Sequence, residues 1–353
     1  MFSRLVAVVA FAVVPGYCAD WSPRLAAEYL DSRQKEWFAW PAAKATGGPC
    51  VSCHTGITYL LVRPALRRAL GESAPTSYER GLLDGLRARV EKKTAPELSP
   101  NAKEPFASQK LGVESVFSAL FLVGQDSGRA TLSSETKQAF DRLWSLQILD
   151  GKAKGAWPWF DLDLDPWETP DSAFYGASLA ALAAGSAPAE YRDQPGIRKR
   201  IAALTGYLQR EQQAQPLHNR LTLLWASSKL PSALPESARR PLLDEILGKQ
   251  QADGGWTLES LGSWKPHAQA PAATGSNSYA TGFVAFALEQ AGLARSHPAL
   301  TRALDWLRSH QNRQFGYWTA DSMNKPYEAD SMPVRFMQDA ATSFAVMALL
   351  GAE

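Results

Sequence analysis

Net charge and cysteine are what this 353-residue sequence has least of. Its 37 basic and 35 acidic side chains leave a formal net charge of +2, and it contains only three cysteines. Because the basic and acidic side chains are nearly equal in number, the sequence gives no sign of a nucleic-acid surface, and no nucleic-acid partner is expected. A hydrophobic content of 45% with 20% charged residues is typical of a soluble chain with a sizeable core.

Long apolar runs are also scarce outside the N-terminus. Arg4 is followed by ten apolar residues (5–14) and then by the small residues Gly16 and Ala19. A run of ten is too short to span a bilayer, and this order is typical of a signal peptide. We therefore expect a signal peptide at 1–19, a periplasmic or otherwise exported chain, and no transmembrane span after its removal. The alternative is a buried N-terminal helix.

The two cysteines beyond this segment lie in one short motif, GGPCVSCHTG (47–56), where His54 directly follows Cys50 and Cys53. Residues i, i+3 and i+4 share one face of a helix. We therefore expect a helix that begins near Pro49 and presents all three side chains to one flat ligand. A C-x-x-C-H run is a signature of c-type haem attachment.

The motif resembles that of c-type cytochromes, over these five residues only. The resemblance implies one covalent haem c, with Cys50 and Cys53 bound to its vinyl groups and His54 as the iron ligand. A local disulfide or a redox-active dithiol would need no adjacent histidine. Zinc would need a second Cys/His pair, which the sequence lacks. A sixth iron ligand is not selected, and the candidates are His218, Met323, Met332 and Met337.

The rest of the chain repeats with a period of about 50–60 residues, each copy combining a Gly-x-Trp-like loop with an apolar helix. The clearest copy spans 250–264 and 276–292, and others span 297–351 and 133–185. Degenerate copies cover 76–124 and 195–230. Thr55-Gly56 aligns with Thr281-Gly282, which makes the haem segment (47–62) part of the first of about six helix pairs.

These repeats predict an all-α fold, an α/α barrel (toroid) that fills residues 20–353 as a single domain. The apolar helices form an inner ring and the amphipathic helices an outer one. An open array would need polar capping repeats, which are missing, so closure is expected. The loop tryptophans are expected to wedge neighbouring units together. By the alignment, His218 lies three units from His54, either facing the cavity or partly exposed at a helix start.

The pattern QQADGGW followed by SYATGFVAFAL (250–256 and 278–288) resembles repeats of the terpenoid cyclase and prenyltransferase superfamily, including squalene-hopene cyclases. The resemblance implies an α/α barrel with a deep apolar cavity. The acidic D-x-D-D motif of the cyclases is missing, because Asp161, Asp163 and Asp165 have no adjacent pair and are expected in a solvated loop. A zinc-binding cysteine of the prenyltransferases is missing as well.

Together these features predict an exported monohaem protein on a cyclase-like barrel, which transfers electrons or oxidises an apolar substrate. Whether it is an enzyme stays open, with a haem-dependent oxidoreductase as one form. The expected partners are an apolar small molecule in the barrel and a periplasmic redox partner. The alternatives are a cyclase- or prenyltransferase-like enzyme, or an isoprenoid-binding protein without a catalytic haem.

Overall fold

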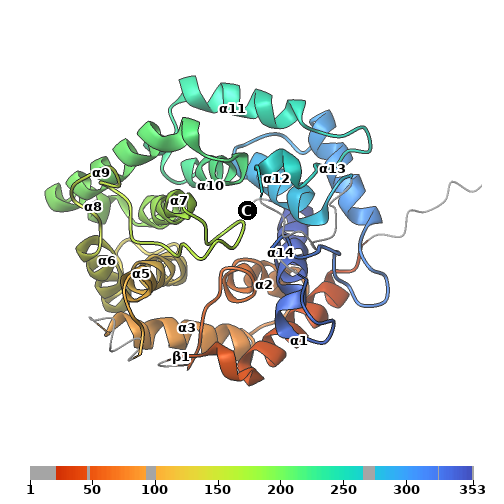
Figure 1. Cartoon of the computed structure of the whole chain (residues 1–353), viewed down its shortest axis with the longest axis horizontal. Helices are drawn as coiled ribbons and strands as arrows, with labels where there is room; N and C mark the ends of the chain where they lie inside the picture. Colours follow the sequence, from red (N-terminus) through yellow and green to blue (C-terminus); the bar gives the residue numbers. More distant parts are fainter. Residues whose placement is uncertain (1–20, 46–47, 93–100, 265–274, 325, 352–353) are drawn as a thin grey trace, which may run out of the picture.

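The computed structural model describes residues 21–45, 48–92, 101–264, 275–324 and 326–351, so the predicted signal peptide lies outside the described residues. The described helices form two concentric rings (Figure 1). The inner ring consists of α2 (Gly56–Ala69), α5 (Phe106–Gln125), α7 (Ser172–Ser186), α10 (Leu217–Ser227), α12 (Ser278–Gln290) and α14 (Phe336–Leu350). The outer ring consists of α1 (Pro23–Ala39), α3 (Ser77–Val90), α6 (Ser134–Ser145), α9 (Pro195–Glu211), α11 (Glu236–Gly248) and α13 (Pro298–Ser309).

The ring closes between the last helix and the first two, because α14 packs against both α1 and α2. The predicted α/α toroid of outer–inner helix pairs is therefore confirmed, as is its closure. Outside the two rings the described chain has one further α-helix, α8 (Ala189–Arg192), which is a single turn. The two-residue strands β1 (Lys44–Ala45) and β2 (Gly48–Pro49) pair antiparallel just before the cysteine motif.

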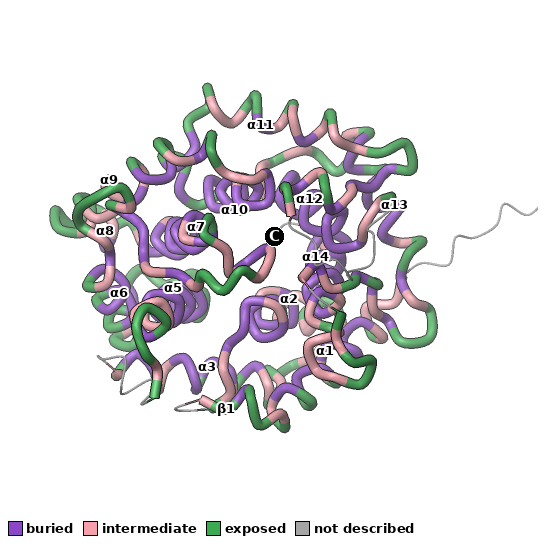
Figure 2. The backbone as a smooth tube through the Cα atoms, in the orientation of Figure 1, coloured by how far each residue is buried: buried purple, intermediate pink, exposed green. Residues whose placement is uncertain are grey.

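Composition separates the two rings. Nearly every residue of α7, α12 and α14 is buried, since these helices are apolar all round and have neighbours on every side (Figure 2). The outer helix α13 instead buries one stripe and has Pro298 in its first turn behind the N-cap His297. In α3, Thr76 and Glu79 form a reciprocal capping box that fixes the helix start.

The tryptophan of the Gly-x-Trp loop is fully buried in three units and makes the same hydrogen bond in each. Its Nε1 donates to a carbonyl in the last turn of the preceding outer helix: Trp157 to Leu143 at 2.7 Å, Trp256 to Ile246 and Trp318 to Leu307 at 2.8 Å. These tryptophans therefore hold each loop against its own helix pair, whereas the wedging of neighbouring units by the loop tryptophans stays a prediction.

A glutamine at the end of three outer helices joins each unit to the next. Its Nε2 donates both to a glycine carbonyl of its own loop and to a carbonyl at the start of the next outer helix. The pairs of acceptors are Gly155 and Arg200 for Gln147, Gly254 and Ala299 for Gln250, and Gly316 and Ser22 for Gln311. The repeated Gln, Gly and Trp are therefore the joints of the toroid.

The cysteine motif does not lie on a helix, contrary to the sequence prediction. The Cys50 amide donates to the Ala43 carbonyl at 2.7 Å, so the β1–β2 hairpin takes the backbone that a helix would use. Residues 53–55 form a turn, and Ser52 Oγ accepts from the amides of Thr55 and Gly56 at 3.1 Å. These two bonds fix the turn that precedes α2, which begins at Gly56 with Thr55 as its N-cap residue.

Among the described helices, α5 is long and apolar enough to cross a membrane, although no such run was expected beyond the N-terminus. In its most apolar window, 72% of the residues are buried inside the toroid. Length and apolar composition here are those of a core helix of the inner ring.

Candidate functional site

Long connections gather at one end of the toroid. The segments that lead from an outer helix into its inner helix include 40–55, 146–171, 249–277 and 310–335. The segments that return from an inner helix to the next outer one are short, for example 70–76 and 291–297. Binding residues are commonly carried by long loops on a rigid scaffold, and the cysteine motif lies at this long-loop end.

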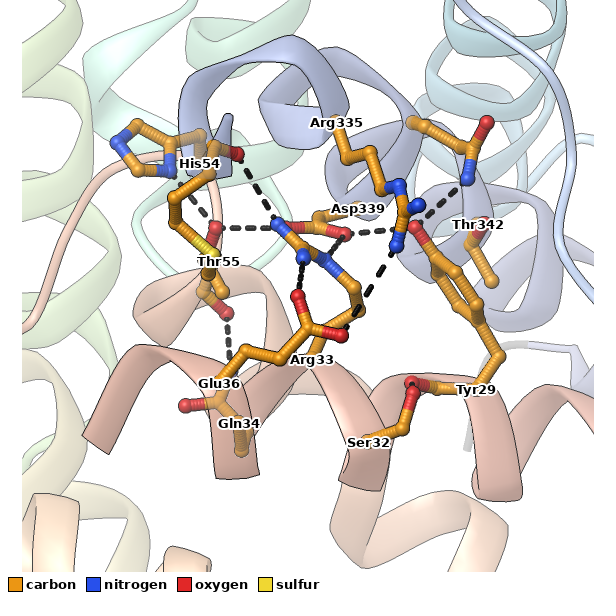
Figure 3. A network of polar contacts seen from close by, with 12 residues as sticks. Tyr29, Ser32, Arg33, Gln34, Glu36, His54, Thr55, Arg335, Asp339 and Thr342 are labelled. Atoms are coloured by element: carbon orange, nitrogen blue, oxygen red, sulfur yellow. Dashed lines mark hydrogen bonds and ion pairs between the residues drawn. The ribbon is translucent and has the colours of Figure 1, made fainter. Parts of the chain in front are cut away.

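His54 is held in one tautomer by a chain of hydrogen bonds (Figure 3). The His54 Nδ1 lies 2.8 Å from Thr55 Oγ1, and Thr55 Oγ1 donates to Asp339 Oδ2 at 2.8 Å. Since the only hydroxyl proton of Thr55 goes to the carboxylate, its oxygen accepts, and Nδ1 must be the protonated nitrogen. The Nε2 of His54 therefore carries the lone pair.

Asp339 is buried at the start of α14 and receives three donors. Arg33 Nε and the Tyr29 hydroxyl each donate to Oδ1 at 2.8 Å, and Thr55 donates to Oδ2. Burial raises the pKa of the Asp339 carboxyl, and the Arg33 guanidinium opposes that rise. The Arg33–Asp339 pair lies between α1 and α14, the first and last of the described helices. It therefore closes the ring, and through Thr55 it also fixes His54.

Aromatic rings surround His54. Its ring stacks on Phe336 with centroids 3.5 Å apart, and the Trp37 ring lies edge-on at 5.5 Å. Trp167 approaches from the 146–171 connection at 6.4 Å. Burial among these rings lowers the pKa of His54 to about 3, and the Arg33 charge adds to this effect. At neutral pH His54 is therefore an uncharged base that remains partly exposed.

Glu168 follows Trp167 in the same connection and is half-buried. Burial raises the pKa of its carboxyl to about 7, so a large fraction is protonated near neutral pH. Its charge is one of the causes that raise the pKa of both cysteine thiols. Sequence reasoning missed Glu168 because the acidic run before it was interpreted as a solvated loop. That interpretation is confirmed for Asp161 and Asp163, which are exposed.

Cys50 and Cys53 are both free thiols. Burial raises the pKa of Cys50 to about 12 and raises that of Cys53 well above its usual value. A redox-active dithiol needs a thiol pKa below the ordinary one, so this alternative does not fit. Trp37 Nε1 donates to the Cys50 carbonyl at 2.7 Å and anchors the motif to α1.

His218 lies on the opposite inner wall, in α10, as the repeat alignment predicted (Figure 1). It is fully buried, so the alternative of a partly exposed helix-start residue is wrong. Asn219 uses its amide nitrogen on Asp171 O and Gln215 Oε1, which leaves Oδ1 to accept from His218 Nδ1 at 3.1 Å. His218 Nε2 then accepts from the Tyr279 hydroxyl at 2.8 Å.

Trp167 connects the two histidine centres. Its ring lies 6.4 Å from His54 and 5.8 Å from Tyr279, whose hydroxyl contacts His218. Burial lowers the pKa of His218 to about 4, so both histidines are uncharged at neutral pH. The motif and the central aromatic cluster thus form one continuous site.

The candidate methionine ligands have separate environments. Met323 and Met337 are buried in the core, whereas Met332 is partly exposed and its carbonyl accepts from Arg33 Nη2 at 3.2 Å. Across the described residues no group of three or more His, Cys, Asp or Glu could hold a metal ion.

Comparison with known proteins gives no sequence family: neither a family profile nor a curated protein sequence matches this chain. Solved structures do match. A polysaccharide lyase is 11% identical over 93% of this chain and 96% of its own, with a TM-score of 0.52. The GH76A α-1,6-mannanase of Salegentibacter sp. HEL1_6 is 12% identical over 93% of this chain and 100% of its own, also at 0.52.

A third solved structure is an inactive variant of that mannanase with two consecutive aspartates replaced by asparagine, in complex with α-1,6-mannotriose. It is 12% identical over 93% of this chain and 100% of its own, with a TM-score of 0.50. With sequence identities this low, the structural similarity shows a shared toroid fold only. A shared fold does not by itself assign a function.

These comparisons correct two predictions. The similar structures are carbohydrate-active toroids, so the assignment to the terpenoid cyclase and prenyltransferase superfamily is wrong. The predicted function, a haem redox protein with a cyclase or isoprenoid-binding protein as the alternative, is contradicted with it. The physical reason is that the repeated Gln, Gly and Trp join helix pairs, and any toroid built this way needs such joints.

Proposed function

We propose that the long-loop end of this toroid binds a polysaccharide and cleaves it by acid–base chemistry. The observation that carries the proposal is the orientation of His54, whose Nδ1 is committed to Thr55 and whose Nε2 lone pair is left free. This arrangement is typical of a general base, since a second group fixes the tautomer and the ring position.

The proton donor in this proposal is Glu168. A carboxyl with a pKa of about 7 is partly protonated at neutral pH and can still donate its proton readily. The ring of His54 lies 6.4 Å from the ring of Trp167, and Glu168 directly follows Trp167 in the chain. The aromatic side chains around His54 suit the apolar faces of sugar rings. His54 Nε2 would take the proton from the carbon next to the one that bears the glycosidic oxygen. A carbon–carbon double bond would form between these two carbons as the carbon–oxygen bond breaks, and Glu168 would protonate the leaving oxygen.

The substrate class is supported by the matching toroids, whose names describe a polysaccharide lyase and an α-1,6-mannanase. The mannanase variant is inactive without its two consecutive aspartates, and the present sequence contains no two consecutive aspartates. A histidine base with one carboxylic acid suits elimination better than the paired carboxylates of glycoside hydrolysis. An exported location, as the N-terminal segment predicts, would give access to such polymers.

The test is an assay of residues 20–353 against a panel of neutral and acidic polysaccharides, following reducing ends and the ultraviolet absorbance of unsaturated products. We expect His54→Ala and Glu168→Gln to lower the rate at least about 100-fold. His310→Ala is the matched control, because this histidine stacks on Trp306 of the outer ring. Full activity of both site variants would refute the proposal.

A second proposal concerns the cofactor alone. We infer that Cys50, Cys53 and His54 can hold one haem c, and the specific observation is the free Nε2 of His54 next to two free thiols. A ligating histidine commonly has its other ring nitrogen hydrogen-bonded, as Thr55 provides here. Each thiol S–H would add across a vinyl group, and the haem would supply an iron atom bound by His54. This proposal assigns no electron transfer.

The two proposals use the same lone pair and therefore exclude each other. The intact mass of the chain, produced in a host with cytochrome c maturation, separates them. An added haem mass that is lost in Cys50→Ala/Cys53→Ala supports attachment and leaves His54 unable to act as a base. An unmodified chain refutes the haem.

A further inference from the structure

A groove of about 460 Å³ lies on the outside of the ring closure, between α1 and the segments that lead into α14. Its walls include Tyr29 and Ser32 of α1 and the aromatic residues Phe315 and Tyr317. Phe315 is 54% exposed and lines this groove. An aromatic ring that is open inside a groove is available to stack on a ligand.

Two aromatic rings of the groove, Phe315 and Tyr317, are nearly parallel, 3° apart with centroids at 6.3 Å. Tyr29 lies against Tyr317 at 5.4 Å with its ring tilted by 54°. The amides of Gln314 and Gln338 lie at the rim. Stacked aromatics with amides around them suit a sugar, since the C–H face of a pyranose packs on the rings and its hydroxyls reach the amides.

The charges of the groove favour a neutral ligand. Glu28 and Arg335 line it with one charge of each sign, so neither an anionic nor a cationic ligand gains a net attraction.

The groove also adjoins the candidate site. Gln338 Nε2 donates to the Tyr29 hydroxyl at 2.9 Å, and that hydroxyl donates to Asp339 Oδ1 at 2.8 Å. The other oxygen of Asp339 holds Thr55 and through it His54 (Figure 3). One carboxylate therefore connects the groove to the base.

We propose that this groove is a second binding site for a neutral sugar unit, which holds a polysaccharide chain beside the His54 site. The inference rests on the proposed function and names a separate anchoring surface for the same class of substrate. Phe315 supplies the stacking face, and Gln314 and Gln338 supply the hydrogen bonds.

The test measures binding without cleavage. His54→Ala is titrated by calorimetry with each polysaccharide that the wild-type chain cleaves, and the same titration is done with His54→Ala/Phe315→Ala. We expect about tenfold weaker binding for the double variant, the effect of losing one stacked ring. The matched control is His54→Ala/Leu149→Ala, since Leu149 is also an exposed apolar side chain, at 58%, and lies outside the groove.

The outcomes separate the two claims. Equal affinity with and without Phe315, in a chain whose wild type cleaves the polymer, overturns the groove alone. Absence of both cleavage and binding across the panel overturns the proposed function and the groove together.

Discussion

Arg33 and Asp339 are 306 positions apart in the sequence, yet Arg33 Nε donates to Asp339 Oδ1 at 2.8 Å and both side chains are buried. The ion pair joins the first outer helix to the last inner helix. Thr55 Oγ1 donates to the same carboxylate and accepts from His54 Nδ1, so the carboxylate fixes the orientation of the imidazole. Closure of the ring and preparation of the candidate base therefore depend on one buried charge.

Removal of Arg33 should destabilise the fold strongly. Arg33→Met leaves the Asp339 carboxylate buried without its cation, which costs about 3–5 kcal/mol in the free energy of unfolding. Urea denaturation measures this change. The control is Arg210→Met, because Arg210 pairs with Glu211 at the surface and such pairs contribute about 0–1 kcal/mol. Similar losses for the two variants would contradict a closing role for the pair.

Thr55→Val should lower activity while the toroid stays folded. The substitution keeps the shape of the side chain but removes the oxygen that accepts from His54 Nδ1, so the tautomer and ring position are no longer fixed. Loss of such a supporting partner typically reduces activity about 10–100-fold. We expect the decrease in kcat, with circular dichroism unchanged. Thr205→Val, at a partly exposed threonine of α9, is the control.

The rate should fall as the pH rises through about 7. Burial raises the pKa of Glu168 to about 7, so the protonated acid is present below this pH and is lost above it. The base sets the other limit: the pKa of His54 is lowered to about 3, so its lone pair is available above pH 3. A pH–rate profile measures both limbs. If Glu168→Gln keeps the alkaline limb, another group is the acid.

Gly316→Ala should destabilise the chain more than Gly292→Ala. Both glycines have a positive φ, +80° and +84°, so the backbone strain of alanine is about the same, 1–2 kcal/mol. A Cβ on Gly316 would lie 2.3 Å from the Leu25 backbone of α1, whereas none of the described atoms lies within 4 Å at Gly292. The excess loss of Gly316→Ala, read from thermal unfolding, measures the contact between the last and first units.

The fold was predictable because its joints repeat. A glutamine, a glycine and a tryptophan recur in three of the units at the place where one helix pair meets the next, so their spacing shows the repeat. The start of α2 was placed too early, since the turn fixed by Ser52 and the β1–β2 hairpin are local features that the i, i+3, i+4 argument does not include.

The candidate site was predictable only in part. His54 and the cysteines stand out as a motif, and the alignment placed His218 on the opposite wall. Asp339 and Arg33 could not be paired from the sequence, because nothing local connects opposite ends of a chain. A lone aspartate at the start of an apolar helix was the available signal. Glu168 acquires its role from burial beside Trp167, which the polar residues around it conceal.

The ring has a consequence for the order of assembly. Asp339 belongs to α14, which is synthesised after the other described helices of the toroid, so a nascent chain has its histidine and both thiols long before it has the carboxylate that orients the imidazole. Until that helix arrives, the first unit has an open flank and its thiols can be reached by other molecules. A chain truncated before α14 would therefore contain every residue of the cysteine motif and still lack a prepared base.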